Sequence, residues 1–116
     1  MGQPIAMFEI VSTEPVRARD FYTKLFDWSA GPELDGYTLL ETGAGEGAVN
    51  GGIGASMSPG DTGTKIYVKV DDLPAAISAA VALGGAEVVP PTDLPEGYGR
   101  FAVVADPDGH AVGLWA

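Results

Sequence analysis

The sequence has no cysteine, which excludes disulfide bonds, thiolate nucleophiles and zinc or iron–sulfur sites held by cysteine. It has a single histidine, His110, and no apolar run close to the roughly 20 residues that a membrane-spanning helix requires. The N-terminus also lacks the basic flank and long apolar stretch of a secretory signal. These absences together predict a soluble, cytoplasmic protein.

Basic residues are scarce: 6 lysines and arginines stand against 16 aspartates and glutamates, for a formal net charge of −10 at pH 7. Such a charge repels phosphate backbones and anionic membrane surfaces. We therefore expect neither a nucleic acid nor a membrane as a partner. The charge modestly favours a cationic small molecule, but a surface that only keeps the protein soluble accounts for it better.

The first part of the chain predicts a strand followed by a helix. Residues 5–11 are rich in strand formers, and Pro15 suits the first position of a helix that Thr13 or Glu14 caps. The spacing of apolar residues in this helix gives it one face that we expect to be core. That face consists of Ala18, Phe21, Tyr22, Leu25 and Phe26.

A second strand and helix follow about halfway along the chain. Polar and apolar residues alternate over residues 64–70, which predicts a strand. Asp71 or Asp72 caps the helix that follows, and the pair Gly84-Gly85 ends it. Further strands, separated by turn residues, are expected over residues 28–31, 37–41, 49–55, 86–89, 99–105 and 110–115.

The predicted elements give the order βαβββ twice, which indicates an internal duplication. Val11 and Pro15 in the first half match Val70 and Pro74 in the second, about 59 residues later. We therefore predict an α+β fold, in which two tandem βαβββ units form a curved, cup-shaped mixed sheet with flanking helices. The expected boundaries of the single domain and of its two units are about 1–116, 5–56 and 64–116.

The glycine-rich residues 41–63 do not form a nucleotide-binding motif, because no helix follows the glycines. A loop of unpredictable conformation at residues 43–63, with a closely packed strand in the segment "GGIGA", accounts better for them. No serine lies in the G-x-S-x-G turn of a nucleophilic hydrolase.

Three segments resemble the vicinal oxygen chelate superfamily, which includes glyoxalase I, extradiol dioxygenases, and fosfomycin- and bleomycin-resistance proteins. They are "STEPVRARDFYTKLFDW", "YVKVDDLPAAISAAVALGGAEVVPP" and "GRFAVVADPDGHAVGLW". The resemblance implies paired βαβββ units, a cup-shaped pocket between them and a homodimer.

The resemblance also implies where a divalent ion would be held in the members that use one. Three of the four ligand positions fall on Met7, Lys65 and Gly113, and the fourth belongs to a middle strand, where Glu41 or Asn50 is a candidate. A thioether, an ammonium group and a glycine cannot replace imidazole and carboxylate ligands. We therefore expect no metal and no other cofactor.

Two-residue alternation along the strands predicts which side chains share the face of the cup. These are Met7, Glu9, Val11, Lys65, Tyr67, Lys69, Ala111, Gly113 and Trp115, with Tyr37, Tyr98 and Arg100 as candidates at its mouth. A pocket lined by methionine, tyrosine and tryptophan suits an organic ligand. Gly113 is expected to leave ligand volume where a metal-binding carboxylate would otherwise project.

Among these candidates, Glu9 and Lys65 are the two that we expect to be able to take part in acid–base chemistry. If they face each other, they form either a partly buried structural ion pair or a catalytic pair. In the second interpretation Glu9 is a general base, or Lys65 clamps a substrate carboxylate or enolate.

His110 follows the turn Asp106-Pro107-Asp108-Gly109, and all four of these residues suit a tight turn for backbone reasons. We expect the turn to be structural and the histidine to face solvent or cap the turn.

Two functions remain open. The first is a metal-independent protein that sequesters an apolar or aromatic metabolite or antibiotic, as bleomycin-resistance proteins do; the acidic surface suits a cationic one. The second is a glyoxalase-like lyase or isomerase that uses Glu9 and Lys65 for acid–base chemistry or has a metal site that the sequence does not reveal.

Overall fold

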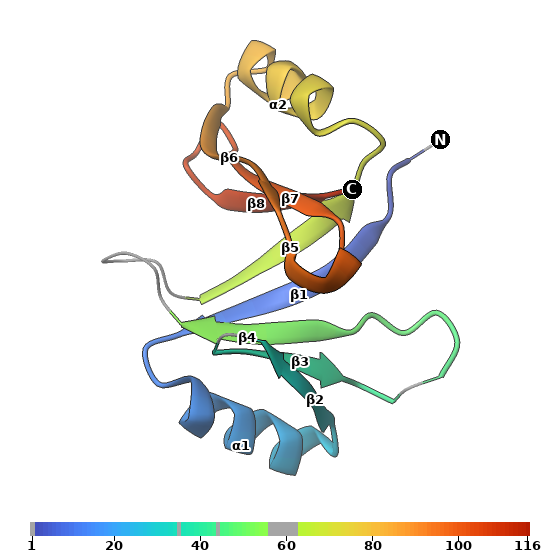
Figure 1. The fold of residues 1–116 in the computed structure, drawn as a ribbon. Coiled ribbons are helices and arrows are strands. Elements are labelled where there is room, and N and C mark those ends of the chain that lie inside the picture. Colours follow the sequence, from blue (N-terminus) through green and yellow to red (C-terminus); the bar gives the residue numbers. More distant parts are fainter. Residues whose placement is uncertain (1, 35, 44, 56–62) are drawn as a thin grey trace. The chain divides into compact units, whose positions relative to one another are not determined.

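A computed structural model of the chain describes residues 2–34, 36–43, 45–55 and 63–116. The first half contains a strand, a helix and three further strands, in the predicted order (Figure 1). These are β1 (Ile5–Ser12), α1 (Pro15–Phe26), β2 (Ser29–Leu34), β3 (Tyr37–Glu41) and β4 (Gly51–Ala55). The second half repeats this order with β5 (Gly63–Lys69), α2 (Leu73–Ala82), β6 (Ala86–Asp93), the short 3₁₀ helix η1 (Pro95–Gly97), β7 (Arg100–Ala105) and β8 (Ala111–Trp115).

The chain folds as two compact units, which we call the first and the second unit. The first contains Met7–Lys65, and the second contains Ile66–Ala116 together with Met1–Ala6. The strand order is β2-β3-β4-β1 in the first unit and β5-β8-β7-β6 in the second, although residues 63–65 of β5 belong to the first unit and residues 5–6 of β1 to the second. In each unit one pair is parallel, β1 with β4 or β5 with β8, and the remaining pairs are antiparallel. The predicted α+β fold with a mixed sheet is confirmed, and the shared cup stays a prediction.

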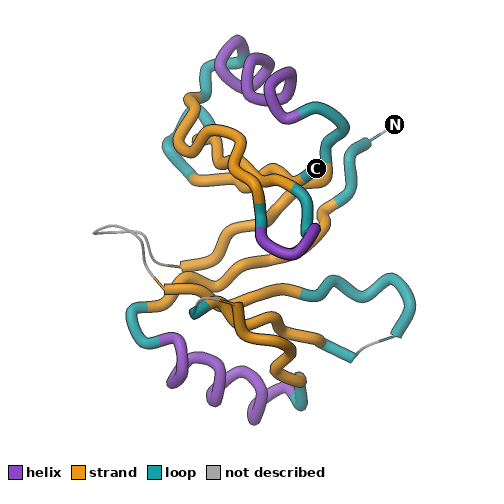
Figure 2. Tube along the Cα trace, in the orientation of Figure 1, coloured by secondary structure: helices purple, strands orange, loops and turns teal. Residues whose placement is uncertain are grey.

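The second unit has the larger buried core. Helix α2 lies over one face of β6 and β7 (Figures 1 and 2). Its core consists of Val70, Leu73, Ile77, Ala102, Val104 and Leu114. The helix begins where the Asp72 carboxylate accepts a hydrogen bond of 3.0 Å from the Ala75 amide, and it ends before Gly84, whose φ of +100° suits glycine.

Helix α1 differs from the prediction in two respects. Its N-terminal cap is Glu14, but no side chain there bonds the helix; instead Ser12 Oγ accepts a hydrogen bond from the Glu14 amide. The face expected to be core is also largely exposed: Phe21, Leu25 and Phe26 are 58%, 58% and 52% exposed. This apolar face of α1 is wider than the surface that the helix shares with β4 and β2, so the two strands cover only part of the face.

The boundaries of two strands differ from the predicted ones, because local contacts override the residue pattern there. Strand β6 continues through Pro90 and Pro91 to Asp93, because it lies at the end of the strand order and an irregularity in its register between Val89 and Thr92 accommodates the prolines. Strand β4 begins at Gly51, after Asn50 has turned its side chain to the Thr42 amide.

No helix in the described part of the chain is long and apolar enough to cross a membrane.

Candidate functional site

The first unit contains a buried carboxylate beside an ammonium group. Glu9 lies on β1, on the face away from α1, and Lys65 lies on β5. Lys65 Nζ is 3.6 Å from Glu9 Oε2, and the two side chains are 15% and 11% exposed. At that separation the groups attract each other electrostatically but do not form a close hydrogen bond. The structure thus brings together the two residues that strand alternation placed on one face.

One oxygen of this carboxylate is incompletely satisfied. Glu9 Oε2 is buried and has no hydrogen-bond partner among the residues that the structure describes. Buried polar atoms in proteins are nearly always hydrogen-bonded, and an exception requires an explanation.

Strand β4 passes this carboxylate as a row of glycines. Gly52 pairs with Glu9, and Gly54 pairs with the next inward residue of β1, Val11. The ring of Tyr37, on the neighbouring strand β3, covers both glycines, so that a Cβ atom at either one would overlap it. The position of a Cβ at Gly54 lies 2.8 Å from Tyr37 Cδ2 and 3.7 Å from Glu9 Oε1. The tyrosine ring and the Glu9 carboxylate therefore lie over the same face of β4, and the ring fills the space above the two glycines.

The second unit contains an aromatic cluster on the face away from α2. Tyr67 pairs with Gly113, and Lys69 pairs with Trp115. The rings of Tyr67 and Phe101 lie 6.5 Å apart in an edge-to-face arrangement, and Lys69 Nζ lies 5.7 Å from the centre of the Trp115 ring. These contacts make a surface that suits an apolar or aromatic molecule.

The expectation that Gly113 leaves volume for a ligand is wrong. A Cβ at this position would overlap the ring of Tyr67, which lies directly over the glycine and is 8% exposed. An aromatic side chain on the adjacent strand has taken the space that the missing side chain leaves.

The residues expected at the mouth of the pocket lie in different surroundings. Tyr98 is 43% exposed, and its backbone carbonyl accepts a hydrogen bond of 2.7 Å from Trp115 Nε1, so it fixes the tryptophan. Arg100 is exposed and pairs with Asp93 at 2.9 Å. By strand alternation it lies on the same side of β7 as Ala102 and Val104, away from the aromatic cluster.

The positions implied for metal ligands provide few suitable donors. Met7 is partly buried on β1, Lys65 pairs with Glu9, and Gly113 has no side chain. Glu41 is exposed, and Asn50 Oδ1 accepts hydrogen bonds from Thr42. Among the described residues, no three histidine, cysteine, aspartate or glutamate side chains are grouped so that they could hold a metal ion. This donor set does not fit a divalent ion.

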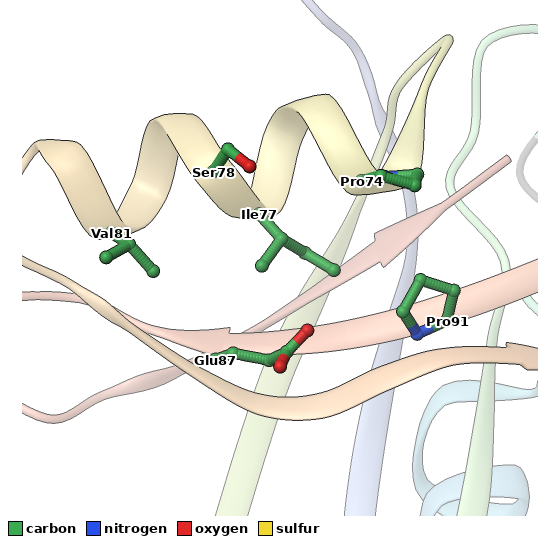
Figure 3. Close-up of a pocket in the computed structure, with 6 residues that line it drawn as sticks. All are labelled: Pro74, Ile77, Ser78, Val81, Glu87 and Pro91. Carbon is green, nitrogen blue, oxygen red and sulfur yellow. The ribbon is translucent and has the colours of Figure 1, made fainter.

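A groove of about 520 Å³ lies between α2 and β6 in the second unit (Figure 3). It is lined by Pro74, Ile77, Ser78, Val81, Glu87 and Pro91. Its polar groups, on Ser78 and Glu87, are exposed, so no desolvated group orients a ligand there. None of the predicted site residues lines it.

His110 is exposed and belongs to the turn, as expected. The Asp106 carboxylate accepts hydrogen bonds of 2.9 Å from the amides of Asp108 and His110, and Asp106 and His110 also pair through their backbones. The turn is therefore closed by Asp106, and the histidine contributes its backbone.

Substituting Asp106 tests this structural role of the turn. Asp106→Ala is expected to lower the free energy of unfolding by about 1 to 2 kcal/mol, because two amides lose their acceptor. Asp106→Asn retains an acceptor oxygen and should lose less, and Asp108→Ala should stay within about 0.5 kcal/mol of the parent chain. Urea unfolding measures all three. Equal losses in Asp106→Ala and Asp108→Ala would contradict the assignment.

Phe101 belongs to the aromatic cluster but was not predicted as a site residue. The close packing of the glycines of β4 was predicted, but their contact with Tyr37 was not. Alternation in "RFAVVA" places Phe101 opposite the core residues of β7, which is a signal that the sequence contains. The contact of Tyr37 with Gly52 and Gly54 depends on the pairing of β3 with β4, which the sequence does not specify.

The sequence model of the glyoxalase-like domain family matches residues 7–114 of this chain. The chain belongs to this family. The predicted membership of the vicinal oxygen chelate superfamily is thereby confirmed, and a solved structure agrees with it. That structure is a member of the glyoxalase/bleomycin resistance protein/dioxygenase superfamily from Vibrio splendidus, with a TM-score of 0.66 at 13% identity over 97% of each chain.

Two other proteins are similar to this chain in sequence. "Putative glyoxylase CFP32" of Mycobacterium tuberculosis is 31% identical over 120 residues, which cover 92% of this chain and 43% of that protein. The anthracycline biosynthesis protein DnrV of Streptomyces peucetius is 30% identical over 130 residues, covering 98% of this chain and 46% of that protein. The chain thus spans less than half the length of these relatives.

Proposed function

We propose that this glyoxalase-like chain binds a small apolar or aromatic organic molecule, a metabolite or an antibiotic, without a metal ion. The observation that carries the proposal is the pairing of Lys65 with Glu9 at 3.6 Å. Lys65 stands where the superfamily resemblance implies a metal ligand, and its ammonium group already neutralises the neighbouring carboxylate. A divalent cation there would meet a fixed positive charge and only one hard donor.

The aromatic cluster of the second unit supports an organic ligand. Phe101 and Trp115 are partly exposed aromatic side chains next to the buried ring of Tyr67, and Lys69 adds a charge beside Trp115. This composition, mostly aromatic with few polar groups, is typical of small-molecule sites. The similarity to a protein named for anthracycline biosynthesis is consistent with an aromatic ligand.

Thermal-shift screening with and without divalent metals tests the proposal. The panel contains glycopeptides, polyketides, and thioester or hemithioacetal substrates. A ligand well above its dissociation constant should stabilise the folded chain by a few kcal/mol, to the same extent in EDTA as in added metal. Stabilisation that depends on a metal ion would contradict the proposal.

A glyoxalase-like lyase or isomerase is the second candidate function, and the same pair of residues favours it. A buried carboxylate next to an ammonium group can remove a proton from a carbon atom of the substrate and then return it. In that case Glu9→Gln should abolish turnover of a hemithioacetal while ligand binding persists. For a binding protein, no member of the panel is turned over.

We also propose that the protein is cytoplasmic and that it forms the homodimer that the resemblance implies. Size-exclusion chromatography with light scattering would test the dimer.

A further inference from the structure

We infer that Glu9, together with the ring of Tyr37, is a recognition site for a protonated amine carried by the ligand. The inference rests on the proposed function and specifies the chemical class of the bound molecule. It concerns the first unit alone, where Glu9, Tyr37, Gly52, Gly54 and Lys65 all lie.

The unsatisfied carboxylate oxygen is the first reason. Glu9 is 9% exposed, and its Oε2 atom has no hydrogen-bond partner in the described part of the chain. Lys65 Nζ, at 3.6 Å, compensates the charge but does not supply a close donor. Leaving a buried acceptor unpaired is costly, and an N–H donor from a ligand would remove that cost.

The tyrosine ring beside the carboxylate is the second reason. The point above Gly54 that lies 3.7 Å from Glu9 Oε1 lies 2.8 Å from Tyr37 Cδ2. Because β4 has only hydrogen atoms as side chains at Gly52 and Gly54, the ring and the carboxylate approach each other there without an intervening side chain. An aromatic ring next to a carboxylate is a combination that binds ammonium groups, through the ring quadrupole and charge-assisted hydrogen bonds.

The net charge of the chain, not the neutral pair of Glu9 and Lys65, favours a cation over an anion. Lys65 repels a monovalent ammonium group less than it repels a divalent ion, and the ammonium group needs hydrogen-bond acceptors rather than several hard ligands. A carboxylate has about four lone-pair sites, so Glu9 can interact with Lys65 and with a second cation at once. An anionic ligand would have to compete with Glu9 for Lys65, in a chain whose net charge of −10 repels it. The same net charge attracts a cationic ligand.

A matched pair of probes tests the inference. 2-Phenylethylamine, protonated at pH 7, and 2-phenylethanol have nearly the same shape, and NMR titration of the full chain measures the affinity for each. We expect the amine to bind at least about tenfold more tightly, which corresponds to one charge-assisted contact. In Glu9→Gln the two affinities should become equal. Glu41→Gln removes an exposed carboxylate from β3, the strand that carries Tyr37, and should preserve the preference.

A measurement on the unsubstituted chain keeps the test decisive even if Glu9→Gln does not fold. The amide signals of Gly52 and Gly54 should shift with the amine at concentrations at least about tenfold lower than those at which the alcohol shifts them. Equal affinities of the parent chain for both probes, absence of amine binding, or an amine preference that persists in folded Glu9→Gln would overturn the inference. These results leave metal-free binding standing, because that proposal is contradicted by metal retention or metal-dependent binding and not by the loss of an amine preference.

Discussion

Replacing Gly113 with alanine is expected to lower the free energy of unfolding by about 3 kcal/mol, the upper part of the range for overpacked cores. The added methyl group would overlap the ring of Tyr67, which is buried and sits directly over the glycine in the paired strand. The ring therefore has to move or the strands have to separate. Urea-induced unfolding followed by circular dichroism measures the loss.

Two further variants isolate the contact between ring and glycine. Gly31→Ala, in another strand, meets neighbouring atoms no closer than 3.4 Å and should cost less than about 1 kcal/mol. In a Tyr67→Ala background, Gly113→Ala should lose most of its effect, because the two residues are in direct contact. A Gly113→Ala chain as stable as the parent would contradict the position of the ring.

Replacing Lys65 with methionine is expected to lower the free energy of unfolding by about 3 kcal/mol, because it leaves a buried carboxylate without its cation. The two side chains are only 15% and 11% exposed, so water cannot fully replace the lost partner. Adding Glu9→Gln to Lys65→Met removes the unpaired charge, and the double variant should be more stable than Lys65→Met alone. Chemical denaturation at pH 7 measures both chains.

Lys69→Met provides the matched control on the same strand. Lys69 is exposed, and the variant loses only its contact with the Trp115 ring, which is worth about 0.5 to 1 kcal/mol at such a site. Equal losses for Lys65→Met and Lys69→Met would show that the pair with Glu9 has no special role.

The elements of the fold follow from local patterns in the sequence. Apolar spacing and capping residues predicted both helices, and the Asp72 cap of α2 forms through its side chain. Alternation along β1 and β5 placed Glu9 and Lys65 on one face, and the two side chains meet there. These features depend on residues close together in the chain or on a period of two, which a sequence displays directly.

Features that depend on strand pairing were harder to predict. Whether the space over Gly113 stays empty is decided by Tyr67, which reaches it only because β5 pairs with β8 in one register. Phe21 and Leu25 have the spacing of core residues, but more than half of each residue is exposed. Much of the glycine-rich loop predicted at residues 43–63 lies outside the described residues.

The metal content of the purified chain tests the central proposal most directly. The chain is purified without chelators, dialysed against nickel, zinc, manganese and iron in turn, and analysed by mass spectrometry of the elements. We predict that no ion is retained in a stoichiometric amount and that the melting temperature does not change with any of them. One ion retained per chain, and lost in Glu9→Gln, would contradict the proposal of a metal-free binding site.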